Sequence, residues 1–149
     1  MADLTVTLTE ALSLNNDVYD NSNTLTIASI SEVTKRVVTV TTTEATILTF
    51  SAAAGQGTYI AANVRYIRFT NLDGTNHIML TFKDEDNTEF RVKLDKGESF
   101  IYNSDLAGGL VDTMKANGAA LSSGLADLYD ITADADSDSC KLEYFIASV

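Results

Sequence analysis

Alternation of apolar and polar residues is strongest between Arg65 and Tyr102, where four strand-like runs are separated by the turn sequences DGTN, DEDN and DKGE. Successive side chains of a strand point to opposite faces, so each alternating run has one dry face and one wet face. The apolar positions that we assign to the dry face of the second and third runs are Ile78, Leu80, Phe82, Phe90, Val92 and Leu94. The pattern predicts an antiparallel meander.

The start of the chain alternates as well. Leu4, Val6 and Leu8 share one phase while threonines occupy the other, and the phase continues to residue 14, so we expect a strand over 4–14. Residues 15–23 are rich in Asn and Asp, which favour turns, and predict a loop or wide hairpin connection. A second strand is expected over 24–30.

Residues 35–50 form the most β-branched part of the chain and predict two strands, 36–43 and 45–51, which fold back at Glu44. The segment is apolar and nearly uncharged between Arg36 and Glu44. Left exposed, it would be prone to aggregation. We therefore expect it to be central in a sheet or covered by another subunit.

The chain changes character after Tyr102, since residues 103–124 are rich in Gly, Ala and Ser and lose the alternation. We expect a long loop there that holds at most a short helix, followed by strands over 125–133 and 141–147. The turn signals lie close together and no helix-period segment separates the strands. The prediction is an all-β, antiparallel and jelly-roll-like sandwich that forms a single domain over residues 1–149.

Charge and composition limit the classes of partner that the protein is expected to bind. The formal net charge is −11, and the ten Lys and Arg residues are scattered, so we do not expect nucleic acid as a partner. The pattern of the N-terminus is not that of a signal peptide, and no apolar run approaches bilayer length, so we expect no membrane partner and synthesis in the cytoplasm. The single cysteine, Cys140, excludes a disulfide within the chain.

Candidate catalytic residues are sparse. The single histidine, His77, has no evident nucleophile or orienting partner in the pattern, and Cys140 follows an acidic turn that raises the pKa of a thiol. We therefore predict no catalytic residue and no cofactor site, and expect that the protein is not an enzyme.

The strongest metal candidate is Asp134, Asp136 and Asp138, which are spaced like the first ligands of an EF-hand calcium loop. Ser139 and Phe145 stand where that loop needs glycine and a bidentate glutamate. We interpret the segment as an acidic turn, with a looser calcium site as the alternative.

A long loop in a compact domain commonly contacts a partner, which makes residues 103–124 the first interface candidate. Tyr66 and Arg68 share a face of their predicted strand and form a second one. The complete set of interface candidates is Leu106, Leu110, Val111, Met114, Tyr66 and Arg68.

Three segments carry a family resemblance: NVRYIRFTNLDGTNHIMLTF, FRVKLDKGESFIY and the ending LEYFIASV. They resemble small β-sandwich virion proteins of tailed bacteriophages, especially marine and cyanobacterial ones. The resemblance implies a component of a virus particle. It does not distinguish the head from the tail.

Small size, acidic charge and the lack of catalytic candidates favour the head. We expect a capsid decoration or cement protein on the virion surface, synthesised in the host cytoplasm, that clamps neighbouring capsomers. Its partners would be the major capsid protein and further copies of the chain, with a homotrimer favoured. Two alternatives stay open: a tail or head-fibre component, and a carbohydrate-binding adhesin that uses Tyr59, Tyr66 or residues 103–124.

Overall fold

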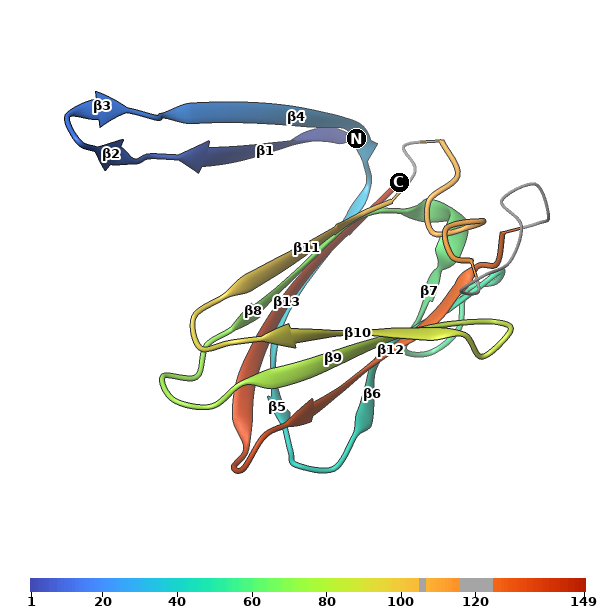
Figure 1. The fold of residues 1–149 in the computed structure, drawn as a ribbon. Helices are drawn as coiled ribbons and strands as arrows, with labels where there is room; N and C mark the ends of the chain where they lie inside the picture. The colour runs from blue at the N-terminus through green and yellow to red at the C-terminus, as the bar shows by residue number, and fades with distance from the viewer. Residues whose placement is uncertain (105–106, 116–124) are drawn as a thin grey trace.

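The computed structural model describes residues 1–104, 107–115 and 125–149. One sheet contains five strands: β6 (Ala45–Ser51), β7 (Thr58–Ile60), β9 (Ile78–Asp84), β10 (Glu89–Leu94) and β12 (Leu128–Ala135). The other contains four: β5 (Glu32–Val40), β8 (Val64–Asn71), β11 (Ser99–Asn103) and β13 (Cys140–Ser148). The two sheets pack face to face, which confirms the predicted all-β sandwich (Figure 1).

The five-stranded sheet has the order β10-β9-β12-β6-β7, and the four-stranded sheet has the order β11-β8-β13-β5. Neighbouring strands are antiparallel except for β6 and β7, which are parallel. The four runs of the predicted meander are therefore real strands that do not form one sheet. The chain passes from β8 to β9 in the opposite sheet and returns from β10 to β11.

Asn71, at the end of β8, makes side-chain hydrogen bonds to both of these connections between the sheets. Its side-chain amide donates to the carbonyl oxygens of Asn76 and Leu94, at 2.9 and 3.1 Å, and its side-chain oxygen accepts from the Asp73 amide. The residue is completely buried. A buried amide with all these partners fixes the path of the backbone where it leaves one sheet for the other.

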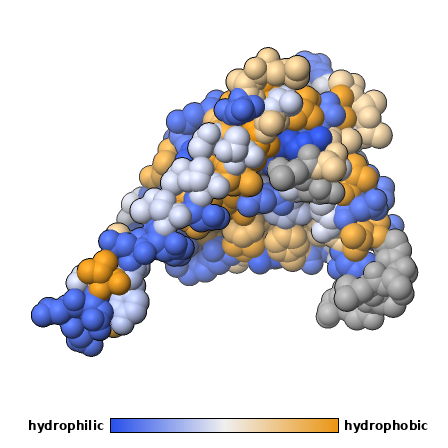
Figure 2. Space-filling view, turned by 90° about the horizontal axis from the view of Figure 1, so that it is seen from above, coloured by the Kyte–Doolittle hydropathy of each residue, from blue (hydrophilic) through white to orange (hydrophobic). Residues whose placement is uncertain are grey.

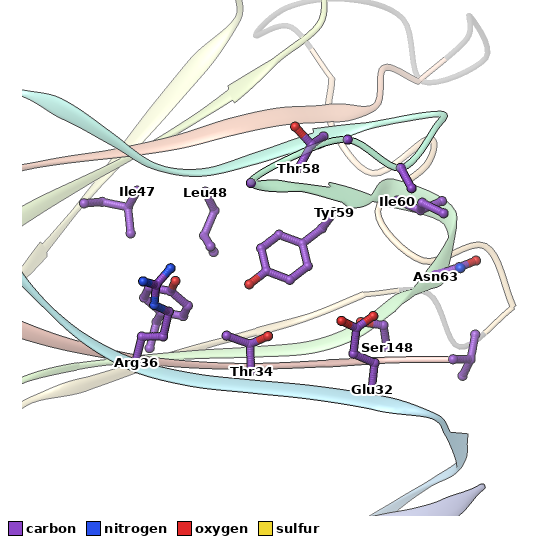
Figure 3. Close-up of a pocket in the computed structure, with 15 residues that line it drawn as sticks. Glu32, Thr34, Arg36, Ile47, Leu48, Thr58, Tyr59, Ile60, Asn63 and Ser148 are labelled. Atoms are coloured by element: carbon purple, nitrogen blue, oxygen red, sulfur yellow. The ribbon is translucent and has the colours of Figure 1, made fainter.

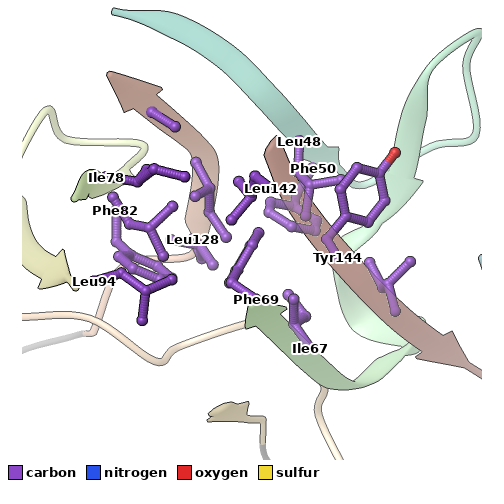
Figure 4. Packing of buried hydrophobic residues seen from close by; sticks show 14 of the residues in the cluster. Leu48, Phe50, Ile67, Phe69, Ile78, Phe82, Leu94, Leu128, Leu142 and Tyr144 are labelled. Atoms are coloured by element: carbon purple, nitrogen blue, oxygen red, sulfur yellow. The ribbon is translucent and has the colours of Figure 1, made fainter. Parts of the chain in front are cut away.

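The core between the sheets contains the side chains that the alternation places on the dry face (Figure 4). Ile78, Leu80 and Phe82 are fully buried, and Leu94 is buried beside them. Phe90 is partly exposed and stacks on Phe82 with 4.7 Å between ring centroids. The rings that also surround Phe82 are Phe69, Phe100 and Tyr102.

The first thirty residues form a long hairpin outside the sandwich, which we call the arm (Figure 1). Its long strands are β1 (Ala2–Glu10) and β4 (Asn21–Ile30), and its tip pairs β2 (Ser13–Leu14) with β3 (Asp17–Val18). Asn15 and Asn16 make the turn, with φ of 53° and 69°. Asparagine tolerates this left-handed backbone, which a two-residue type I′ hairpin turn requires. Residues 15–23 therefore belong to a hairpin connection, as one of the two predicted alternatives has it, but the connection is tight and not wide, because a two-residue turn and parts of two strands occupy most of it.

The predicted fold-back at Glu44 is confirmed, and β6 matches the expected strand 45–51. The preceding strand starts earlier than expected, since β5 begins at Glu32. Among the described strands it pairs with β13 alone and is an edge strand, so a central position is wrong for β5, and cover by another subunit stays a prediction. Val33 and Val37 lie about half exposed on it.

Within residues 103–124, the described positions form turns that pack against the body of the sandwich. Met114 makes an isolated β-bridge with Ala126, and the Leu110 amide donates to the Ala61 carbonyl oxygen. Gly109 has φ of +68°, and an added Cβ would lie 2.4 Å from that same oxygen. A short 3-10 turn spans Ala61–Asn63, and no helix of the described residues is long and apolar enough to cross a bilayer.

Candidate interaction surfaces

The arm has two chemically different faces. Register places Leu4 opposite Ile27 and Val6 opposite Leu25, with Leu8 continuing the same apolar face. The other face consists of hydroxyl side chains, which are Thr5, Thr7, Thr9, Ser22, Thr24 and Thr26. Cross-strand hydrogen bonds join two of these pairs, Thr7 with Thr24 and Thr9 with Ser22.

Within the described part of the chain, the apolar face is covered at the base of the arm and not toward its tip. Ile27 and Ile30 are buried at the base against Tyr66 and Ala147 of the four-stranded sheet, with Leu4, Val6 and Leu25 packed partly against them. Further out, Leu8 is 57% exposed. Figure 2 shows the arm as a projection from the body, with a hydrophobic group near its tip. The exposed apolar side chains toward the tip are Leu8, Leu12, Leu14, Val18 and Tyr19.

A break in register at the base directs the arm outward. Ala2 pairs with Ile30 and Leu4 pairs with Ile27, so β4 has one residue more than β1 between these pairs. Ser29 adopts φ of 66° in this bulge. A β-bulge bends and twists its strand, which accounts for the divergence of the arm from the sandwich in Figure 1.

The outer face of the four-stranded sheet combines exposed valines with basic side chains. Val33, Lys35, Val37 and Thr39 of β5 lie beside the outward residues of β13. Those residues of β13 are Lys141, Glu143, Phe145 and Ala147, of which Ala147 is buried under the base of the arm. We call this surface, with Arg68 of the adjacent β8, the β5–β13 face.

Glu143 is the carboxylate at the centre of this face. It contacts Lys35 at 3.1 Å and Arg68 at 2.6 Å. Its side chain is only 15% exposed, whereas that of Lys35 is 60% exposed. The charge that the β5–β13 face presents to solvent is therefore positive, in a chain that is strongly acidic overall.

A cleft of about 540 Å³ opens between the edge strand β5 and the β6–β7 edge of the opposite sheet (Figure 3). Glu32, Thr34 and Arg36 line it from β5, and Tyr59 reaches into it from β7. Burial raises the pKa of the Tyr59 hydroxyl, which interacts with Thr34 and Tyr144 of the four-stranded sheet. Tyr59 thus joins the two sheets across the open side of the sandwich.

The predicted interface residues are divided between surface and interior. Tyr66 and Arg68 do share the outer face of β8, but Tyr66 is buried under the base of the arm. Leu110 and Met114 lie in the main core, with Val111 partly buried against it. Leu106 lies outside the described residues. Of these side chains, Arg68 is the one placed on the β5–β13 face.

The two residues considered for catalysis, His77 and Cys140, both lie close to aspartates of the neighbouring turns. His77 Nδ1 lies 3.4 Å from an Asp136 oxygen. Cys140 is fully buried, and this burial, assisted by the carboxylates of Asp73, Asp138 and Asp136, raises its pKa. The predicted direction of the thiol pKa is therefore confirmed, although burial is a larger cause than the acidic turn.

The three aspartates of the possible calcium loop do not converge. Asp134 belongs to β12, Asp136 contacts His77, and Asp138 accepts a hydrogen bond from the Ser139 amide. Among the residues that the structure describes, no three His, Cys, Asp or Glu side chains are arranged to hold a metal ion.

Asp84, the first residue of the DEDN turn, has a structural role that the sequence pattern did not reveal. The residue is buried, and its carboxylate accepts from the amides of Asp86 and Thr88 at 3.0 and 2.6 Å. These bonds close the DEDN turn, in which Asn87 has a positive φ. An aspartate at the first position of a turn is the available signal for such a cap.

The chain matches no protein-family model. A search of curated proteins finds no match either. Among solved structures, it is similar to a chain described under "Bacillus endospore appendages form a novel family of disulfide-linked pili". The sequence identity is 11%, the TM-score is 0.46, and the match covers 83% of this chain and 92% of the other. A likeness of this size does not identify a shared function.

Proposed function

We propose that the protein is a structural subunit of a virus particle, a capsid decoration protein that attaches to the outside of a phage head. The observation that carries the proposal is the arm, a projecting hairpin with exposed apolar side chains on a well-packed sandwich. The assignment to a phage particle, rather than to another protein assembly, rests on the resemblance of the three sequence segments, and the head is favoured by the small size and acidic charge of the chain.

An isolated two-stranded hairpin is marginally stable in water, because it has no third element on which to bury its apolar face. The arm buries that face only near Ile27 and Ile30 and leaves Leu12, Leu14 and Val18 in solvent. Such a hairpin gains stability when a neighbouring subunit covers it. A body that binds the shell, together with an arm that joins a neighbouring subunit, would link capsomers and raise the stability of the shell.

Heads purified without the protein provide the test. Labelled wild-type chain should sediment with these heads and raise their thermal disruption temperature, because a ligand of the assembled state stabilises that state. The variant Leu12→Asp/Leu14→Asp should bind heads less, since it places charges on the arm tip. Thr7→Asp, which adds a charge to the hydroxyl face of the arm, is the matched control.

The outcomes separate the alternatives. Wild-type chain that sediments with isolated tails but not with heads supports a tail component and contradicts decoration. Wild-type chain that binds neither particle overturns the virion assignment. Equal binding of the two aspartate-bearing variants and the wild type would show that the arm is not the attachment element.

Glycan binding is the second candidate function, and the cleft in Figure 3 favours it, because it combines an aromatic ring with polar side chains. The ring of Tyr59 and the side chains of Glu32, Thr34 and Arg36 are groups that recognise sugars by stacking and hydrogen bonds. A glycan array probed with the wild type and with Arg36→Ala tests this. If the wild type binds a glycan and Arg36→Ala does not, the result favours the adhesin. If the wild type binds no glycan on the array, the adhesin hypothesis is rejected.

A further inference from the structure

We propose that the arm of one copy of the chain lies on the β5–β13 face of a second copy, so that copies associate head to tail. The inference names the partner of the arm and rests on the proposed function, in which the protein is a subunit of an assembly. It starts from three features of the described residues: charge, apolar pattern and the packing at the base of the arm.

Charge favours this pairing. The side chains of residues 1–30 include four carboxylates, Asp3, Glu10, Asp17 and Asp20, and no Lys or Arg. The β5–β13 face offers Lys35, Arg68 and Lys141 around the recessed Glu143. Opposite charges that meet across an interface guide association and exclude other orientations.

The apolar groups also correspond. Leu8 on the arm and Val33 and Val37 on the edge strand are each more than half exposed. Scattered exposed apolar residues are ordinary on a protein surface. Here Leu8 lies on a hairpin whose apolar face is exposed, and Val33 and Val37 lie on an edge strand whose outer face is basic. A single contact between the two surfaces would bury all three side chains.

The packing within one chain shows that the two surfaces are compatible. At its base the apolar face of the arm already packs on the four-stranded sheet, where Ile27 and Ile30 contact Tyr66 and Ala147. The bulge at Ser29 then directs the rest of the arm away from its own sheet. At about 3.3 Å per residue, the thirteen residues from Ala2 to Leu14 reach about 40 Å, and the tip clears the body in Figure 1.

The outer face of the five-stranded sheet is a poorer partner for an acidic arm. It carries Lys83, Arg91 and Lys93 from β9 and β10, with Glu89 beside them. Glu44 contacts both Lys83 and Arg91, and Asp130 and Asp134 lie on the neighbouring strand β12. Four carboxylates against three basic groups would repel the arm, so this face serves as the control surface.

A head-to-tail contact repeats, because each copy has one arm and one β5–β13 face. Such heterologous contacts close into rings when the rotation between copies permits it, and otherwise form open filaments. The homotrimer expected for the particle component is one such ring.

Charge reversal tests the proposal in solution with the full chain. One variant carries a reversed arm, Glu10→Lys/Asp17→Lys, and the other a reversed face, Lys35→Glu/Lys141→Glu. Sedimentation velocity should show the wild type as an oligomer and each variant about tenfold or more weaker in self-association. An equal mixture of the two variants should recover association between unlike chains, because the lysines placed on one arm then meet the glutamates placed on the face of the other variant.

Reversal of Arg91 and Lys93 to glutamate is the matched control and should leave the oligomer unchanged. Circular dichroism and the melting temperature of each variant check that it folds. A second measurement needs no charge change: Leu8→Cys chains mixed with Val37→Cys chains should form a disulfide between chains. Thr7→Cys chains, with the thiol on the opposite arm face, should not. The native Cys140 is fully buried and does not compete.

Wild-type chain that is monomeric at its highest soluble concentration overturns the inference. So does a mixture of reversed variants that stays dissociated, or a Leu8→Cys chain that reacts equally with Val37→Cys and Lys93→Cys chains. A monomeric wild type that still binds phage heads overturns the contact between copies and leaves the proposed decoration function standing.

Discussion

The arm and the sandwich use the same alternation of apolar and polar residues to opposite effect. In the sandwich, Leu80 is fully buried between two sheets, whereas Leu8 at the same kind of position in the arm is 57% exposed. The difference lies in what faces each strand, since a second sheet covers β9, whereas no residue that the structure describes covers the outer half of β1. An apolar stripe without cover in its own chain indicates a surface for another chain.

The prediction with the largest expected effect on stability compares the same substitution, leucine to aspartate, in the sandwich and in the arm. Leu80→Asp should unfold the sandwich, at a cost of about 4 kcal/mol or more, because it places an unpaired charge in the core. Leu8→Asp, measured where the chain is monomeric, should change the free energy of unfolding by less than about 0.5 kcal/mol. Urea unfolding followed by circular dichroism measures both. A large loss in Leu8→Asp would show that the arm is part of the folding unit.

Gly109 tests whether the turns after β11 belong to the rigid body of the sandwich. Gly109→Ala should destabilise the protein by about 2–4 kcal/mol, because its Cβ would enter the backbone at Ala61 and Ala62 and its φ is positive. Gly74→Ala is the matched control, since no atom lies within 4 Å of the added Cβ. The two melting temperatures give the answer, and equal values would contradict the close packing.

The DEDN turn contains a buried acidic residue with a structural role, Asp84, and an exposed one, Asp86, which can be compared directly. Asp84→Ala removes its bonds to the amides of Asp86 and Thr88 and should cost about 2 kcal/mol. Asp86→Ala, at an exposed position of the same turn, should cost less than about 0.5 kcal/mol. Chemical denaturation distinguishes them, and similar losses would contradict the capping role.

The smallest expected effect concerns Asp130 on the outer face of the five-stranded sheet. Burial raises its pKa, and one of its oxygens is buried with no hydrogen-bond partner among the residues that the structure describes. The folded state therefore holds the proton to a higher pH than the unfolded state, so stability falls as pH rises from the ordinary aspartate range through the folded pKa.

Asp130→Asn should consequently stabilise the protein by about 1 kcal/mol at pH 7 and have little effect at acidic pH, where the native carboxyl is protonated. Melting temperatures of the two proteins across this pH range measure it. A variant that is less stable than the wild type at pH 7 would show that the carboxylate makes a favourable contact there.

The sequence by itself determined most of the strands and several turns. Alternation at Ile78, Leu80 and Phe82 predicted a buried face that the structure confirms, because the two-residue period is a local property of the extended backbone. The fold-back at Glu44 was predicted from the β-branched residues on either side of it, and the all-β class from closely spaced turn signals. Asn15 and Asn16 contained the signal for a tight turn, whereas the prediction was a loop or a wide hairpin connection.

Only the tertiary structure decided which strands share a sheet and which apolar stripes are covered. Periodicity is identical for Leu8 and Leu80, and it carries no information on what packs opposite each strand. The β5–β13 face depends on Lys35, Arg68 and Glu143, which come from three strands far apart in the chain. Leu110 likewise entered the core because its turn packs on the backbone near Ala61. Local pattern sets the direction of a side chain along its strand, and long-range pairing sets its environment.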